Sequence, residues 1–367
     1  MTTSKKVATR SVPAAKAMAS VVPLSKPAAK TEPTPARKSR AKSKPVAEPL
    51  VADGPLAAPK PAAVQIAMVP VAAIVSSPAP AKLRLFQIYY RPEQRAALDP
   101  AFEPYNNQGD NSPLLEYNVF RKLTQSVQVQ GTELWGALSW KFREKTGLSG
   151  TDLRAIIAAN PGHDVYYCNP HPEFEALYHN LWLQGETSHP NFLVLCREFF
   201  EVTDIPLDNI HTFVASNLFA SANYFVASSR FWAAYIQFVD AVIAKAEAGL
   251  SKTAKAMIYS SAADRKNMHA GASYLPFIVE RLFTVFLASR LKEISAYKFA
   301  LPVKDEKLNV HLKLLKQMKD VALNTKSLWM ATCWVNYRNL YFSKTHGKEW
   351  CSRYINDITP LNFHMNM

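Results

Sequence analysis

The adjacent residues Glu280 and Arg281 lie in the middle of an otherwise apolar stretch, residues 274–290 (YLPFIVERLFTVFLASR). The density of apolar residues predicts a helix that is buried on most of its circumference. A charged side chain is rarely buried without a partner, because removing an unpaired charge from water is costly. The pair is therefore expected either to form a structural ion-pair element or to line a ligand site.

A second candidate site follows a predicted buried strand, residues 164–168 (DVYYC). The next four residues, Asn-Pro-His-Pro, form a predicted turn that contains Asn169 and His171. Ligands in open α/β sheets bind beyond the carboxyl ends of the strands. Imidazole and amide oxygen atoms at this position could hold a divalent metal ion. The alternative is a turn that only begins the following helix.

Two further polar residues stand next to apolar segments. Asn223, in SANYFVASSRFW, could orient a ligand hydroxyl or cap a turn. His269 lies just before the buried helix, beside Gly271. Because a helix N-terminus favours anions, His269 could contact a pyrophosphate group, or it could be a histidine of a surface loop.

Several common catalytic motifs do not occur in the sequence. There is no GxxxxGK[ST], GxGxxG, GxSxG or HExxH. These absences argue against a P-loop ATPase, a classical dehydrogenase and an α/β-hydrolase. The four cysteines show no CxxC spacing, so neither a zinc ribbon nor a disulfide framework is expected. A reduced, cytoplasmic protein fits this pattern best.

The positive charge is concentrated near the N-terminus. Residues 1–82 hold 13 Lys or Arg, three acidic residues, 13 of the 25 prolines and no aromatic residue. Such a segment cannot bury enough apolar surface to offset the entropy lost on ordering, so residues 1–81 are predicted to be a disordered basic tail. The tail could be a spacer, or it could bind nucleic acid or an anionic membrane surface. No secretory signal is expected, because no apolar segment follows MTTSKKVATR.

The remaining chain alternates predicted strands and helices. Strands are expected at residues 82–90, 133–140 and 164–168, with a loop at 99–113. Ser149 or Thr151 is expected to cap one helix, and a second helix is expected from Glu173 onward. Helices fill residues 308–354. This order predicts an α/β domain with a mostly parallel sheet over residues 82–300 and a helical C-terminal region, 301–367, that packs on it.

Several segments together resemble one family. They are FQIYYRPEQ, LDPAFEPYNN, ELWGALSWKFREKTGLSG, DVYYCNP, NLWLQGETSHPNF, NYFVASSRFW and PFIVERLFTVFLA. Over residues 82–295 the chain resembles bacterial cell-surface polysaccharide glycosyltransferases of the lipopolysaccharide or capsule type, with a GT-A-like (Rossmann-like) fold. The resemblance implies a nucleotide-sugar donor and a glycan or lipid-linked acceptor.

The resemblance also implies roles for the candidate residues. Asn169, His171, Asn223, His269 and Arg281 would contact the donor. GT-A enzymes usually place Asp-x-Asp at a strand end to hold Mn²⁺ or Mg²⁺, and this chain has no Asp-x-Asp. Asn169 and His171 have the same spacing but bring no carboxylate. Donor binding could thus be metal-independent, or the chain could be a divergent or inactive relative.

In an inverting transferase, Glu280 would be the carboxylate base that takes the proton of the acceptor hydroxyl, with a pKa raised by low-dielectric surroundings. The expected protein is cytoplasmic and held at the inner face of the membrane by its tail. Two rival functions remain. One is a non-catalytic nucleotide- or carbohydrate-binding relative, and the other is a nucleic-acid-associated protein that binds through the tail.

Overall fold

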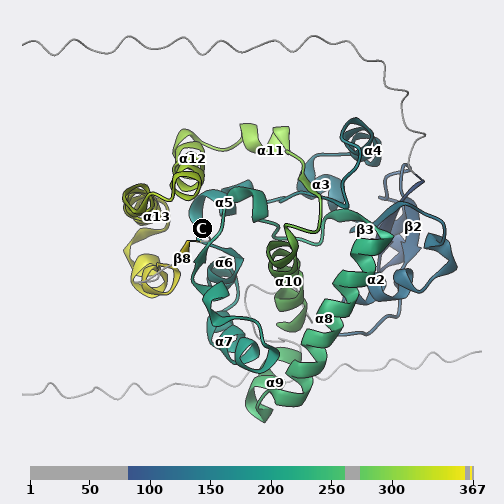
Figure 1. Ribbon diagram of the computed structural model, residues 1–367, viewed down its shortest axis with the longest axis horizontal. Coiled ribbons are helices and arrows are strands. Elements are labelled where there is room, and N and C mark those ends of the chain that lie inside the picture. Colours follow the sequence, from purple (N-terminus) through teal and green to yellow (C-terminus); the bar gives the residue numbers. More distant parts are fainter. Residues whose placement is uncertain (1–81, 261–272, 360–363, 366–367) are drawn as a thin grey trace, which may run out of the picture. The chain divides into compact units, whose positions relative to one another are not determined.

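The computed structural model describes residues 82–260, 273–359 and 364–365 (Figure 1). The predicted tail, residues 1–81, lies outside the described residues, as does His269. The described residues all belong to one of the two units into which the chain divides.

A six-stranded sheet runs through the domain. In spatial order it contains β2 (Glu103–Asn106), β1 (Leu83–Tyr89), β3 (Leu134–Ser139), β6 (Phe225–Ser228), β4 (Val165–Tyr167) and β7 (Ala296–Lys298). β1 is parallel to β2 and β3, and β4 is parallel to β7, whereas β6 is antiparallel to both of its neighbours. The prediction of an α/β fold with a mostly parallel sheet is confirmed. Because β6 is reversed, its first residues lie at the carboxyl ends of β3 and β4.

Thirteen helices are described. They are α1 (Pro92–Arg95), α2 (Glu116–Thr124), α3 (Phe142–Thr146), α4 (Gly150–Ala159), α5 (Pro172–Leu177), α6 (Leu181–Ser188), α7 (Phe192–Thr203), α8 (Ser229–Gly249), α9 (Lys252–Tyr259), α10 (Leu275–Arg290), α11 (Pro302–Glu306), α12 (Val310–Thr325) and α13 (Leu328–Ile358). Short 3₁₀ turns occupy Val127–Val129, Leu207–Ile210 and Ser216–Leu218, and a small second sheet pairs β5 (Thr212–Phe213) with β8 (His364–Met365). Among the described helices, none combines the length and apolar character needed to cross a membrane.

Apolar side chains cover both faces of the central strands, as expected for largely parallel strands. Along β1, Phe86 and Ile88 belong to one buried cluster and Leu85 to another. The larger cluster is aromatic: the rings of Trp135 and Trp232 stack with centroids 4.1 Å apart, and the Trp232 indole Nε1 donates to the Trp135 carbonyl oxygen. This packing fixes α8 against the sheet beside α10.

Close approach of two strands explains the glycine in β3. A Cβ added at Gly136 would lie 2.7 Å from the Phe225 carbonyl oxygen and 2.8 Å from a methyl group of Val226. Real Cβ atoms do not come this close, so only glycine lets β6 lie beside β3 in this way.

The C-terminal helices share the larger buried cluster with the sheet domain. Trp334 and Phe342 of α13 belong to it, and the Trp334 indole Nε1 donates to the Ala176 carbonyl oxygen over 2.9 Å. Figure 1 shows α12 and α13 at one edge of the ribbon, on the outer side of α5 and α6. The helical region that begins near residue 301 therefore packs directly on the α/β domain.

Two local predictions are wrong. The expected loop at residues 99–113 contains strand β2, which lies at the sheet edge and is only partly buried. The helix expected from Glu173 onward is two helices, because the chain becomes extended at Tyr178 and restarts after Asn180. The Asn180 side-chain Nδ2 donates to the carbonyl oxygens of Ile210 and Thr212. The side-chain Oδ1 of Asn180 accepts from the Leu183 backbone amide.

One local prediction is confirmed in detail. Ser149 is the N-cap of α4, and its Oγ accepts from the Asp152 backbone amide over 3.1 Å. The Asp152 carboxylate accepts from the Ser149 backbone amide in return, which completes a capping box.

Candidate functional site

A cleft of about 520 Å³ opens beyond the carboxyl ends of β1 and β3, where β6 begins. Its walls come from the residues after β1 and β3, from those before β6, from the start of α2 and from α10. Open α/β sheets place their ligands at this edge. The structure brings the predicted residues Glu280 and Asn223 together in this cleft.

Glu280 is the half-buried carboxylate that α10 places in the cleft. Burial raises the pKa of Glu280 to about 7, from an ordinary value of 4.5. The nearby Glu116 carboxylate adds to this rise. The charges of Arg281 and Lys145 oppose it, as does a hydrogen bond from the Asn223 backbone amide. Near neutral pH this carboxylate can both accept and release a proton.

A second carboxylate, Glu116, lies in the same cleft at the start of α2. The Asn223 side-chain Nδ2 donates to Glu116 Oε2 over 3.3 Å. Burial raises the pKa of Glu116, while Lys145 and the hydrogen bond from Asn223 lower it. Asn223 thus bridges both carboxylates, through its side chain to Glu116 and through its backbone amide to Glu280. Sequence reasoning missed Glu116, because an acidic residue at a helix start is common on any surface helix.

Tyr224 and Ser139 also line the cleft. The Tyr224 hydroxyl lies 3.0 Å from Ser139 Oγ, and Lys145 Nζ lies 5.8 Å from the centroid of the Tyr224 ring. Burial is the main cause that raises the pKa of Tyr224, with the Glu116 carboxylate second. Tyr224 is therefore a neutral hydrogen-bonding group throughout the neutral range.

The backbone that presents Glu116 is strained. Leu115 has φ 47° and ψ −120°, and the Tyr117 amide donates to the Leu114 carbonyl oxygen over 3.1 Å. This geometry matches a type II′ turn, which favours glycine at the position that Leu115 occupies. A non-glycine residue there costs on the order of 1–3 kcal/mol, and such strain is concentrated at functional sites.

Leu115→Gly is expected to raise the free energy of unfolding by about 1 kcal/mol, because glycine adopts this φ and ψ without strain. Urea unfolding at pH 7 measures the change. Leu115→Ala is the matched control, since it removes the side chain but keeps the Cβ that causes the strain, and it should give no gain. A glycine variant less stable than the alanine variant would contradict the interpretation.

Arg281 faces away from the cleft and joins α10 to α6. Its Nε donates to the Leu181 carbonyl oxygen over 2.8 Å, and its Nη2 donates to Gln184 Oε1 over 2.7 Å. The guanidinium carbon lies 4.8 Å from the centroid of the Phe192 ring, and burial lowers the pKa of Arg281. Glu280 and Arg281 therefore divide the two expected roles, with Glu280 in the cleft and Arg281 in a structural junction. Donor contact by Arg281 stays a prediction.

Arg281→Met is expected to lower the free energy of unfolding by roughly 2–3 kcal/mol, because it leaves buried acceptors of α6 without donors. Nucleotide affinity of the folded variant should equal that of the wild type. Thermal unfolding and calorimetric titration, done on the same sample, measure both quantities. A variant of normal stability with weakened nucleotide binding would instead assign Arg281 to the donor site.

Asn169 and His171 lie away from this cleft, at the carboxyl end of β4. Asn169 Nδ2 donates to the His171 carbonyl oxygen and to Glu175 Oε1, and Asn169 Oδ1 accepts from the Ser221 hydroxyl. The His171 ring stacks on Phe174, and its Nδ1 lies 3.3 Å from a Glu173 carboxylate oxygen.

The two side chains therefore have separate partners: that of Asn169 contacts Glu175 and Ser221, and that of His171 contacts Glu173 and Phe174. In the described ranges, no group of three or more His, Cys, Asp or Glu residues could hold a metal ion. Binding of Mn²⁺ or Mg²⁺ by Asn169 and His171 stays a prediction, and it requires both side chains to change partners.

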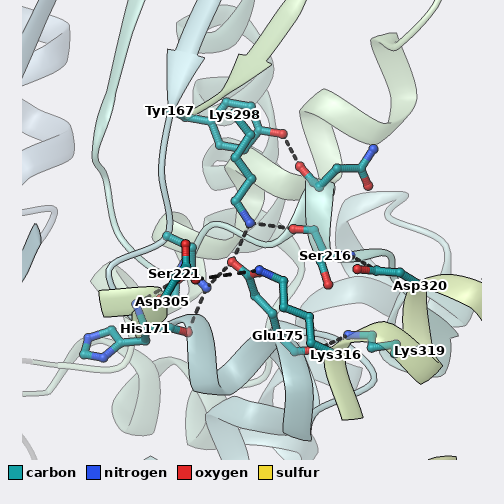
Figure 2. Close-up of polar contacts among 12 residues, drawn as sticks. Tyr167, His171, Glu175, Ser216, Ser221, Lys298, Asp305, Lys316, Lys319 and Asp320 are labelled. Carbon is teal, nitrogen blue, oxygen red and sulfur yellow. Dashed lines mark hydrogen bonds and ion pairs between the residues drawn. The ribbon is translucent and has the colours of Figure 1, made fainter. Parts of the chain in front are cut away.

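Glu175, which accepts from Asn169 Nδ2, is the centre of a buried charged junction. Figure 2 shows Glu175 with its lysine partners. Lys298 of β7 contacts Glu175 Oε1 and the Ser216 carbonyl oxygen, and Lys316 Nζ of α12 lies 2.8 Å from Glu175 Oε2. Lys319 Nζ is fully buried and donates to the backbone carbonyls of Glu175 and Tyr178, at the C-terminal end of α5. Burial lowers the pKa of Lys319 to about 7.

The junction borders a small cavity of about 240 Å³. Its lysines come from β7 and α12, and its carboxylate comes from α5, so the charges connect the C-terminal helices to the sheet domain. No sequence signal could have paired these residues, because more than 120 positions separate the lysines from Glu175.

Comparisons of the chain with models of protein families, with curated proteins and with solved structures found no match.

Proposed function

We propose that the protein is a glycosyltransferase that moves a sugar from a nucleotide-sugar donor to a cell-surface glycan or lipid-linked acceptor. The observation that carries the proposal is Glu280, a carboxylate with a pKa raised to about 7 inside a cleft at the carboxyl ends of β1 and β3. A general base works best when its pKa lies near the working pH. The α/β sheet supports a GT-A-like arrangement, which remains part of the proposal.

The proposed reaction uses ionised Glu280 as the base. The acceptor hydroxyl oxygen forms a bond to the anomeric carbon of the donor sugar, and its proton passes to Glu280. The bond between that carbon and the donor phosphate oxygen breaks, and its electron pair leaves with the nucleotide. Asn223 would hold Glu280 through its backbone amide, and its side chain would hold Glu116.

The sequence gives one specific reason for a second candidate function. The chain lacks Asp-x-Asp, so it could bind a nucleotide or a carbohydrate without turnover. A role at the cytoplasmic face of a membrane, with the basic tail on anionic lipid, also belongs to the proposal. So does the rival in which the tail binds nucleic acid. The tail, residues 1–81, lies outside the described residues.

Calorimetric titration of the full chain with UDP, GDP and CMP, with and without Mn²⁺, tests the donor class. The proposal predicts selective binding of one nucleotide. If no nucleotide binds under either condition, the cleft is not a donor site and the proposed function is wrong. Salt-sensitive binding of DNA without nucleotide binding would favour the nucleic-acid rival.

A further inference from the structure

The large cleft has walls of opposite charge. The two carboxylates, Glu116 and Glu280, come from α2 and α10. A second part of the cleft wall is formed by the residues that follow β1 and β3, and it carries Arg91, Lys141 and Lys145. A single cleft thus offers one wall for a group that loses a proton and another for a group that carries negative charge.

The three cations, Arg91, Lys141 and Lys145, are not engaged in salt bridges within the part of the chain that the structure describes. Lys141 Nζ instead lies 5.0 Å from the centroid of the Trp140 ring. Lysine and arginine residues that line a cleft without forming a salt bridge are suited to phosphate, to which ammonium and guanidinium groups donate strong hydrogen bonds.

Lys145 is the cation of this group whose charge acts on the carboxylates of the other wall, Glu116 and Glu280. Its Nζ lies over the Tyr224 ring. A group held there would be next to the base and next to the cationic wall at once. This is where the leaving phosphate of a transferred sugar must lie, because the acceptor attacks the carbon attached to that phosphate.

The aromatic residues of the cationic wall fit the rest of a nucleotide. Tyr90 and Trp140 both line the cleft beside Arg91 and Lys141. Aromatic side chains stack on nucleobases, and this stacking is tolerant of the base. The cationic wall therefore combines groups for a base with groups for its phosphates.

From this arrangement we infer that Lys145, Lys141 and Arg91 bind the diphosphate of the nucleotide-sugar donor directly, in the role that a metal ion held by Asp-x-Asp would otherwise fill. The inference rests on the proposed function and deepens it. It assigns the donor to the ends of β1 and β3 and the acceptor to the wall formed by α2 and α10. It also places the donor away from Asn169 and His171.

The test uses the full chain and isothermal titration with UDP, GDP and uridine, each in EDTA and in Mn²⁺. We expect a nucleoside diphosphate to bind equally well in EDTA and in Mn²⁺. Lys145→Gln and Lys141→Gln should each weaken diphosphate binding by about tenfold, the loss expected for one charge-assisted hydrogen bond. Lys313→Gln, on the exposed side of α12, is the matched control and should leave binding unchanged. Nucleoside binding should change little in any variant.

Failures of the two proposals can be told apart. Diphosphate binding that is lost in EDTA, or that survives unchanged in both lysine variants, overturns the inference while a nucleotide-binding function stands. Binding of CMP without UDP or GDP also overturns it. Lysine-dependent diphosphate binding without consumption of any nucleotide sugar supports the cationic site and overturns the transferase. If neither diphosphate binds, both proposals fail.

Discussion

Glu280→Gln is expected to abolish sugar transfer and, at the same time, to make the protein more stable above pH 7. The loss of activity follows because glutamine cannot accept the proton of the acceptor hydroxyl, and removal of a general base typically lowers the rate by about 10²–10⁴-fold. A residue that serves only to hold the fold would give the opposite change in stability.

The gain in stability follows from the raised pKa of Glu280, about 7 against an ordinary 4.5. Between these pH values the folded protein keeps a proton that the unfolded chain has released, so wild-type stability falls as the pH rises through this window. The loss amounts to at most roughly 3 kcal/mol above pH 7. Glutamine has no carboxyl proton to release, so the variant does not undergo this loss of stability. The two proteins should be similarly stable at pH 4.5, and the variant should be the more stable of the two at pH 8.

Urea unfolding at pH 4.5, 6 and 8, with transfer assayed on the same samples, measures both effects. Glu201→Gln, an exposed substitution on α7, is the matched control and should alter neither. If Glu280→Gln keeps its activity, Glu280 is not the base. If stability falls equally at all three pH values, the carboxylate makes a structural contact instead.

Glu175→Gln is expected to cause the largest loss of stability of any single substitution considered. The carboxylate is buried against Lys298 and Lys316. Removing one partner of a buried charge pair leaves the other charge without compensation and costs roughly 3–5 kcal/mol. Because these lysines belong to β7 and α12, we expect the C-terminal helices to loosen first.

Glu173→Gln on the same helix is the control. Glu173 pairs with His171, and both side chains are more than a third exposed, so that substitution should cost less than about 1 kcal/mol. Combining Glu175→Gln with Lys298→Met should recover part of the lost stability, because the second substitution removes a buried ammonium group that no longer has a carboxylate partner. Thermal unfolding of the wild type, the two single variants and the double variant measures these changes in stability. An equal effect of Glu175→Gln and Glu173→Gln would contradict the buried junction.

The sequence predicts the central strands well because they are buried on both faces. Residues 83–89 and 134–139 are apolar over most of their length. The first run also contains Phe86, Ile88 and Tyr89, which are residue types that favour strands. Strand β2 was not predicted because it is short, lies at the edge of the sheet and contains Pro104. An edge strand tolerates proline and polar residues, so its sequence looks like a loop.

The candidate site was only half predictable, for a physical reason. Glu280 and Asn223 stand out because each interrupts an apolar run, where burying a polar group is costly unless it has a hydrogen-bonding partner. Glu116 and Lys145 lie in helices of mixed composition, where charged residues are ordinary. Their significance comes from the tertiary fold, which brings α2, α3 and α10 to one cleft.

The central claim is tested most directly by incubating the full chain with a panel of nucleotide sugars and measuring the release of free nucleotide, in parallel with Glu280→Gln. The account predicts that the wild type releases nucleotide from one class of donor and that the variant does not. Release by both proteins at the same rate would contradict the role of Glu280. No release by the wild type from any donor would contradict the transferase itself and leave the cleft as a binding site.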